Sequence, residues 1–197
     1  MITFTKLIPT YKDTVLGWLK EPHVQAFWDT SEAHKNDILN FLEGRTTPSP
    51  YANGRFVYWI GLQDNIPFSL IMTIQEFPNE PRDALKEAYI SQTGTTYALD
   101  YMIGSPAHVG TGVGASTLAA FVDFFKANID TTADTFWIDP DALNPKARHV
   151  YEKAGFIYKG DFINDFIVPG EAPTPGKPTH FLVKILKAPS CHPPLKP

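Results

Sequence analysis

The feature that most constrains the fold is a strand pattern, a glycine-rich loop and a helix pattern that follow one another between residues 95 and 125. The segment "TTYALDYMIG" (95–104) has the composition of a buried strand. The loop "VGTGVG" (109–114) comes next, and apolar residues then recur at helical spacing up to Phe125. With the strands predicted elsewhere, this unit indicates an α/β or α+β fold around a mixed sheet.

The three glycines of the loop, Gly110, Gly112 and Gly114, allow the backbone to approach a ligand closely. The helix that follows presents N–H groups and the positive end of its dipole, so the unit suits a phosphate group. The spacing lacks the G-x-G-x-x-G of dinucleotide-binding proteins and the Gly-Lys-Ser/Thr of a P-loop, which argues against an ATPase or a GTPase. A turn that only permits tight packing of strand against helix remains the alternative.

A second strand–helix unit lies further along, in "DPDALNPKARHVYEKAGF" (139–156). Asn144 is a favoured N-cap and Pro145 a favoured first helical residue, so a helix is expected to begin there. Tyr151 stands nearly two turns after Asn144, which places both side chains along one side of that helix. The alternatives are that Tyr151 is a core aromatic residue and that Asp139 only forms an Asx-turn.

Hydrophobic periodicity predicts the remaining elements. Two amphipathic helices are expected over residues 10–20 and 31–44, with at most a helical turn in the acidic stretch 78–93. Asp64 and Asn65 predict a hairpin turn. Further strands are expected over 2–7, 55–62, 68–77, 134–139, 156–162 and 179–186. The order along the chain is β-α-α-β-β-β-α-β-α-β-β, which predicts a mixed central sheet flanked by helices.

The chain reads as one domain over residues 1–187, followed by a flexible Pro-rich tail over 188–197. The only cysteine, Cys191, lies in that tail, which excludes an intramolecular disulfide and a cysteine-based metal cluster. No histidine spacing suits a metal either, so we expect none. The net charge of −4 does not indicate a nucleic-acid partner. Without a signal-peptide pattern or a membrane-length apolar run, we expect a cytoplasmic protein with no membrane partner.

Taken together, the two units resemble the acetyl-CoA site of the GCN5-related N-acetyltransferase (GNAT) superfamily. Three segments carry a closer likeness to the aminoglycoside 6'-N-acetyltransferases: "LGWLKEPHVQAFWD" (16–29), "ALDYMIGSPAHVGTGVG" (98–114) and "IDPDALNPKARHVYEKAGF" (138–156). The likeness runs in order through residues 2–165 and is looser over 45–95. It implies the GNAT fold, acetyl-CoA as co-substrate and no metal.

The resemblance also implies a set of cofactor-binding residues. Main-chain groups at the end of the first strand and in the loop would hold CoA, at Met102, Ile103, Val109, Gly110, Thr111, Gly112, Val113 and Gly114. The second helix would place Asn144, Ala147 and Tyr151 beside the pantetheine arm. Val109 stands where the family often has Arg or Gln, which is tolerable because the backbone makes the main contacts there.

The catalytic roles follow from residue types at the matching positions. Asp100 would accept the proton of the acceptor amine, directly or through water. Asp100 and Asp139 together would hold the amine by charge-assisted hydrogen bonds. Tyr151, with an ordinary pKa of about 10, would donate to the departing thiolate. Three further residues would line the acceptor pocket, unless they only pack: Phe27, Trp28 and Asp29.

The resemblance thus implies an acyltransferase that moves an acetyl group to a primary amine of a small cationic molecule, with an aminoglycoside 6'-amino group as first candidate. Direct transfer in a ternary complex is expected because the sole cysteine lies in the tail. Acyltransferases of siderophore biosynthesis carry His at the position of Asp100, so the Asp favours the aminoglycoside-like branch. Siderophore-type or other metabolite amines, protein amines and a CoA-sensing module without catalysis remain alternatives. A monomer and a homodimer are both open, and residues 45–95 and 168–178 match too loosely to identify the acceptor.

Overall fold

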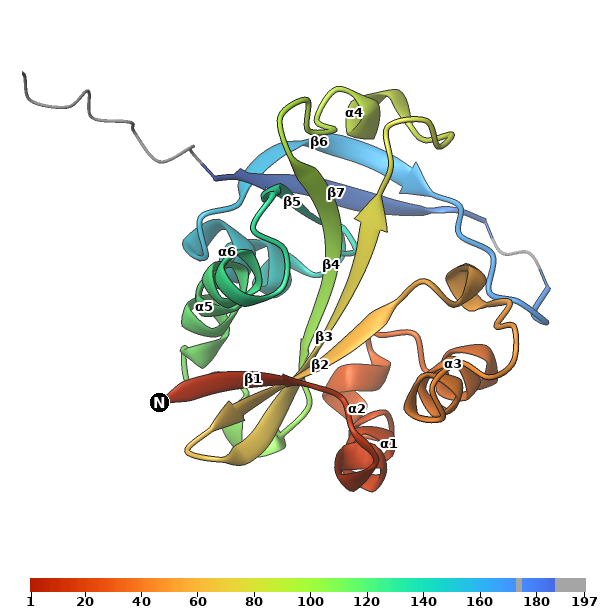
Figure 1. The fold of residues 1–197 in the computed structure, drawn as a ribbon, viewed down its shortest axis with the longest axis vertical. Coiled ribbons are helices and arrows are strands. Elements are labelled where there is room, and N and C mark those ends of the chain that lie inside the picture. The colour runs from red at the N-terminus through yellow and green to blue at the C-terminus, as the bar shows by residue number, and fades with distance from the viewer. Residues whose placement is uncertain (173–174, 187–197) are drawn as a thin grey trace, which may run out of the picture.

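The structure, a computed structural model, describes residues 1–172 and 175–186. The tail expected over 188–197 lies outside the described residues. A single seven-stranded sheet in the order β1-β2-β3-β4-β5-β7-β6 runs through the molecule (Figure 1). The pairing of β4 with β5 is parallel and every other neighbouring pair is antiparallel, so the predicted mixed sheet is confirmed.

The predicted elements are all present, with small changes in their bounds. The strands are β1 (Ile2–Lys6), β2 (Val57–Gln63), β3 (Ile66–Glu76), β4 (Thr95–Ile103), β5 (Ala133–Ile138), β6 (Ile157–Asn164) and β7 (Lys177–Ile185). The α-helices are α1 (Lys12–Trp18), α2 (Pro22–Gln25), α3 (Glu32–Leu42), α4 (Ala84–Glu87), α5 (Val113–Asn128) and α6 (Pro145–Lys153). The short helix α2 was not expected, and no described helix is long and apolar enough to cross a membrane.

Local sequence signals set several element ends as expected. The Asn144 side chain accepts a hydrogen bond from the Ala147 backbone N–H at 3.1 Å, so Asn144 caps α6. Asp64 and Asn65 adopt φ angles of +50° and +66°, the left-handed region that a tight hairpin turn requires. These features confirm the predicted start of α6 and the turn between β2 and β3.

Successive side chains of β4 point to opposite faces of the sheet and pack in different clusters there. Leu99 and Tyr101 pack with α5 and α6 on one face. On the other face, Met102 joins the core beneath α1, α2 and α3, whereas Ala98 packs with a smaller cluster beside α4. Figure 1 shows α5 and α6 together on one side, with α1–α3 and α4 at opposite ends of the view. Asp100 therefore lies between the two clusters of the second face.

The parallel ladder between β4 and β5 ends at Leu99 and Ile138. Beyond this point β4 stays paired with β3 as far as Ile103. The chain after β5 instead follows β7, because the Pro140 carbonyl accepts from the His180 backbone N–H at 3.0 Å. The two strands thus part immediately before the positions of the two predicted acceptor carboxylates.

A buried ion pair fixes α3 to the sheet. Asp37 on α3 is only 1% exposed. Its carboxylate accepts from both Arg45 terminal nitrogens, at 2.7 and 3.1 Å, and from the Tyr58 hydroxyl at 2.7 Å. Burial acts to raise the pKa of Asp37, but the hydrogen bonds, led by that from Arg45, outweigh it and lower the pKa.

We predict that Arg45→Met lowers the free energy of unfolding by about 3 kcal/mol, because it leaves a buried carboxylate without its cation. The matched control is Lys35→Met, which breaks an exposed Lys35–Glu32 pair of the same helix (2.7 Å) and is expected to cost less than about 1 kcal/mol. Urea denaturation of both variants measures the difference. Equal losses in the two variants would contradict the assigned role of the buried pair.

Candidate active site

Asp100 stands at the point where β4 leaves β5, on the face between the α1–α3 and α4 clusters. Burial, followed by the charge of the nearby Asp139 carboxylate, raises the pKa of Asp100 to about 7 against the opposing charge of Lys86. Within the described residues, no side chain donates a hydrogen bond to Asp100. A carboxyl group with a pKa near neutrality and a free lone pair can take up and release a proton at physiological pH.

Asp139, at the end of β5, is paired with a residue that the sequence did not single out. Lys86 Nζ on α4 donates to Asp139 Oδ2 at 2.8 Å and lies 4.3 Å from the centroid of the Phe162 ring. Burial acts to lower the pKa of Lys86, but Asp139, with Glu76 behind it, raises the pKa above its usual value. Lys86 is therefore charged, and Asp139 already holds a cation.

Tyr151 reaches the same point of β4 from the opposite face of the sheet. It is 6% exposed and belongs to the core under α5 and α6. Its hydroxyl lies 3.4 Å from the Tyr101 carbonyl oxygen, longer than an ordinary O–H···O bond, so that carbonyl holds it only weakly. Burial, followed by the charge of Asp100, raises the pKa of Tyr151 far above its usual value. The side chain is thus a protonated hydroxyl that can donate.

The conformation of the glycine loop distinguishes a loop that is open to a ligand from a turn that only permits tight packing. Gly110 and Gly112 adopt φ angles of +76° and +84°, and a Cβ on either would meet nothing within 4 Å. Their conformation, and not packing, demands glycine. A Cβ on Gly114 would instead lie 3.2 Å from Val150 Cγ1 of α6, so Gly114 allows α5 and α6 to pack closely.

The N-terminus of α5 is open to a ligand. Gly112 is its N-cap, and no side chain of the described residues caps it. Val109 is 47% exposed, and the Thr111 hydroxyl donates to the His108 carbonyl at 2.8 Å, which folds the loop back on itself. A hollow beside this helix end is lined by Gln63, Ala107, His108, Thr111, Gly112, Val113 and Ser116. Main-chain N–H groups beside open space suit an anionic ligand.

The other predicted cofactor residues lie at the end of β4 and at the start of α6. Met102 and Ile103 belong to the part of β4 beyond its ladder with β5, and the Ile103 carbonyl contacts His23 Nε2 at 2.9 Å. Asn144 uses its side-chain oxygen to cap α6, and Ala147 packs against the core. Ile103 and Ala147 thus lie on the α5–α6 face of the sheet and Met102 on the other face, and their contact with a cofactor stays a prediction.

The predicted acceptor residues after α2 have different environments. Phe27 is 50% exposed, whereas Trp28 packs against the α1–α3 core. Asp29 accepts from the Ser31 backbone N–H and from the Tyr51 hydroxyl, both at 2.8 Å. Both carboxylate oxygens of Asp29 are thus engaged by the chain itself, which is the arrangement expected of a residue that holds a loop in place.

Neither Lys86 nor Tyr51 was predicted to belong to the site. Lys86 sits in a stretch where only a helical turn was expected, and its neighbours along the chain do not indicate that its ammonium meets Asp139. Tyr51 lies in a 3-10 turn, and its ring stacks on His34 with centroids 5.0 Å apart and meets Phe166 at 5.6 Å. Both contacts join residues that only the tertiary fold brings together.

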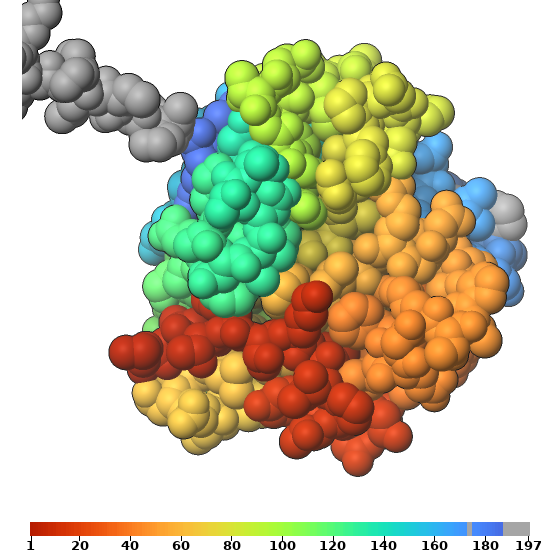
Figure 2. Space-filling view, viewed as in Figure 1, coloured from red at the N-terminus to blue at the C-terminus, as the bar shows by residue number. Residues whose placement is uncertain are grey.

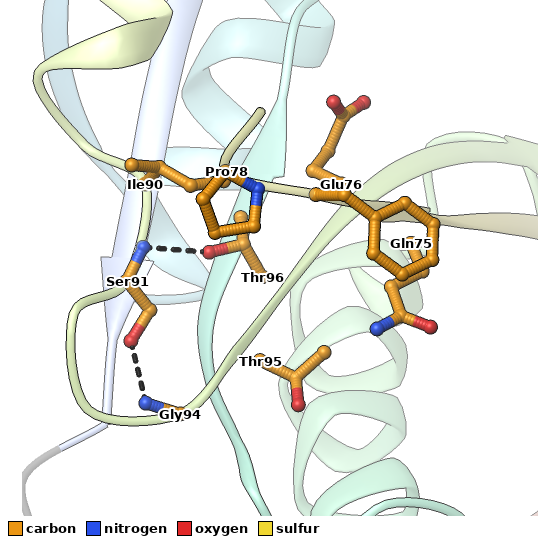
Figure 3. Close-up of a pocket in the computed structure, with 9 residues that line it drawn as sticks. Gln75, Glu76, Pro78, Ile90, Ser91, Gly94, Thr95 and Thr96 are labelled. Carbon is orange, nitrogen blue, oxygen red and sulfur yellow. Dashed lines mark hydrogen bonds between the residues drawn. The ribbon is translucent and has the colours of Figure 1, made fainter. Parts of the chain in front are cut away.

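The acidic stretch before β4 borders a separate small pocket (Figure 3). There the Ser91 backbone N–H donates to Thr96 Oγ1 at 2.8 Å, and the Gly94 N–H donates to Ser91 Oγ at 2.9 Å. The pocket is lined by Gln75, Glu76, Phe77, Pro78, Ile90, Ser91, Gly94, Thr95 and Thr96. It lies at the start of β4, and its lining includes neither Asp100 nor Tyr151, so we place the candidate site at the other end of the strand.

Figure 2 shows the molecule from the same side as Figure 1. The N-terminal segments, coloured red to orange, fill its lower part, and the yellow-green residues around α4 form its top. The two groups correspond to the two clusters on either side of Asp100. The candidate site thus combines three features around β4. Asp100 lies between the two clusters on one face, the Tyr151 hydroxyl lies on the opposite face, and the open N-terminus of α5 follows the end of the strand.

Comparison with known proteins gives a consistent result. A family model described as an acetyltransferase (GNAT) domain matches residues 12–163, while no curated protein matches the chain. Aminoglycoside N(6')-acetyltransferase from Legionella pneumophila superposes with a TM-score of 0.68 at 22% identity, over 93% of this chain and 91% of that one. The aminoglycoside acetyltransferase AAC(6')-Ib, solved with coenzyme A and kanamycin, gives 0.66 at 17% identity, over 94% and 95%.

A polyamine enzyme shares the fold as well. Spermidine N-acetyltransferase from Vibrio cholerae, solved with CoA and spermine, superposes with a TM-score of 0.61 at 13% identity, over 93% of this chain and 95% of that one. At such identities the solved structures show a common fold, while the family model covers most of the sequence in order. The expected family is confirmed, and the chain belongs to the GNAT acetyltransferases.

Proposed function

We propose that the protein transfers the acetyl group of acetyl-CoA to a primary amine of a small cationic molecule, by direct transfer in a ternary complex. The observation that carries this proposal is the placement of Asp100 and Tyr151 on opposite faces of β4, where that strand leaves β5. A thioester lying in this opening would have a proton acceptor on one side and a proton donor on the other.

Asp100 and Tyr151 carry the proton transfers of the reaction. Asp100 accepts a proton from the acceptor ammonium, directly or through one water, and the freed nitrogen lone pair attacks the thioester carbonyl carbon. A carbon–nitrogen bond forms and the carbon–sulfur bond breaks. Tyr151 donates its proton to the departing thiolate. The attacking nitrogen releases its second proton, through water, to restore the Tyr151 hydroxyl, and Asp100 returns its own proton to solvent. The pKa of about 7 at Asp100 suits a base that works at neutral pH.

The glycine loop supports acetyl-CoA as the acyl donor. Gly110 and Gly112 hold the backbone in the left-handed conformation, and the α5 N-terminus directs main-chain N–H groups and the helix dipole outward. These groups would hold the pyrophosphate of the cofactor, and the strand end at Met102 and Ile103 would lie along the pantetheine arm. Bound acetyl-CoA supplies the activated acyl group.

An aminoglycoside 6'-amino group is the first acceptor to test. Related folds were solved with kanamycin and with spermine, both of which carry several amino groups. Asp100 would place negative charge where such an amine enters, whereas Asp139 is already paired with Lys86. Siderophore-type amines, other metabolite amines and protein amines are the rival acceptors, and a CoA-sensing module is the rival without catalysis.

Asp100→Asn tests the assignment of the base. With acetyl-CoA and a panel of kanamycin, spermine and simple amines, thiol release should give a kcat/KM lower by about 10²–10⁴. The Kd for CoA, measured by calorimetry, should stay unchanged. Asp123→Asn, at an exposed site on α5, is the matched control and should retain full activity. Turnover by the Asp100 variant within threefold of wild type would contradict the proposal, and CoA binding by wild type without turnover of any amine would favour the sensor.

The pH dependence gives an independent test. Only the ionised form of Asp100 accepts a proton, so kcat/KM should rise through a pH of about 7 and level off above it. The acceptor amine titrates as well, so its separately measured pKa is held constant when the profile is fitted. The charged and titratable groups around Asp100 are Asp139, Lys86 and the hydroxyls of Tyr51 and Tyr151. An enzyme inflection between pH 4 and 5 would mean that Asp100 has an ordinary pKa.

A further inference from the structure

Lys86 is fixed in place on three sides. Its helix, α4, begins at Asp83, whose carboxylate accepts from the Leu85 backbone N–H at 2.7 Å. The Lys86 ammonium donates to Asp139 at 2.8 Å, and the ring of Phe162 on β6 lies 4.3 Å away. The Lys86 and Asp139 side chains are 24% and 20% exposed. A cation held over an aromatic ring and against a carboxylate, largely shielded from water, is a well-defined feature of the site.

The surrounding carboxylates are matched by cations of the chain in the same way. Glu80 accepts from both terminal nitrogens of Arg55, at 2.7 and 3.2 Å. Arg82 pairs with Glu87 at 2.9 Å and lies 3.6 Å from Glu76. Within the described residues, no side chain donates a hydrogen bond to Glu76 or to Asp100, but Glu76 has Arg82 as an ion-pair partner and Asp100 has no ion pair. The acceptor end of the site thus leaves one anionic position available to a ligand.

We infer that Lys86 determines acceptor specificity, because its ammonium occupies, at Asp139, the place that a second amino group of the acceptor would take. The inference rests on the proposed function. It assigns to this chain a preference for acceptors that carry a single amino group at the reacting end, above di- and polyamines of the same size.

The preference follows from competition for one carboxylate. Lys86 is part of the chain, so its ammonium stays at high local concentration near Asp139, whereas a free amine must enter from water. A second substrate amine can bind Asp139 only by displacing Lys86, and the displaced ammonium then loses its partner and its contact with the ring. Hydrogen bonds to charged groups contribute about 1.5–3 kcal/mol, which corresponds to tenfold or more in affinity.

The test uses two acceptors that differ only in a second amino group, butylamine and 1,4-diaminobutane. In Lys86→Met, and in Lys86→Gln, the ratio of kcat/KM for the diamine to that for the monoamine should rise about tenfold or more. Lys86→Arg keeps the cation and should keep the wild-type ratio. Lys153→Met makes the same change in charge at an exposed position on α6 and should also keep it. Calorimetry on the CoA-loaded protein should show the same gain in diamine affinity without turnover.

The outcomes separate the two proposals. An unchanged ratio and an unchanged diamine affinity in folded Lys86 variants that still acetylate amines would overturn the specificity role and leave the proposed function intact. The same rise in the ratio in Lys153→Met would also overturn it, because net charge would then be the cause. Wild-type protein that binds CoA but acetylates no amine would overturn the proposed function and this inference with it. Thermal unfolding of each variant identifies those that fold.

Discussion

The candidate site depends on the end of one strand pairing. The backbone bonds between β4 and β5 stop at Leu99 and Ile138, since β4 then follows β3 while the chain after β5 follows β7. This separation frees the second half of β4 on one edge, and backbone groups there must find other partners. It also leaves Asp100 on one face and Tyr151 on the other beside the part of β4 that β5 no longer covers. If the β4–β5 ladder continued past Leu99, the sheet would separate the two side chains.

The helices on the two faces of the sheet set the protonation states of Tyr151 and Asp100. The α5–α6 layer buries Tyr151 and so keeps its hydroxyl protonated. On the other face, the gap between the α1–α3 core and the α4 cluster leaves Asp100 shielded yet without a cation of its own, so its pKa rises toward neutrality. The neighbouring carboxylates differ because the chain supplies their cations. The protein thereby concentrates the available negative charge at one residue.

Sequence patterns predicted most of the fold, whereas most residues of the candidate site were named from the family resemblance. Local signals sufficed for Asn144 at the start of α6 and for the turn at Asp64 and Asn65, because capping and turn geometry depend on adjacent residues. Helix spacing placed Tyr151 on one side of its helix with Asn144, whereas the role of Asp100 was an expectation from the family resemblance. The pairing of Lys86 with Asp139 could not be predicted, since it joins residues far apart in the chain whose meeting depends on how α4 packs over β6.

The central claim is that the reacting thioester lies between Asp100 and Tyr151. A crystal structure of the protein with a bisubstrate analogue, in which the CoA sulfur is linked to an acceptor amine, tests it most directly. The amine nitrogen should lie within about 3.2 Å of an Asp100 carboxylate oxygen, or one water away, with the sulfur within about 4 Å of the Tyr151 hydroxyl. A sulfur bound elsewhere than the opening between β4 and β5, or an amine that faces neither residue, would contradict the account.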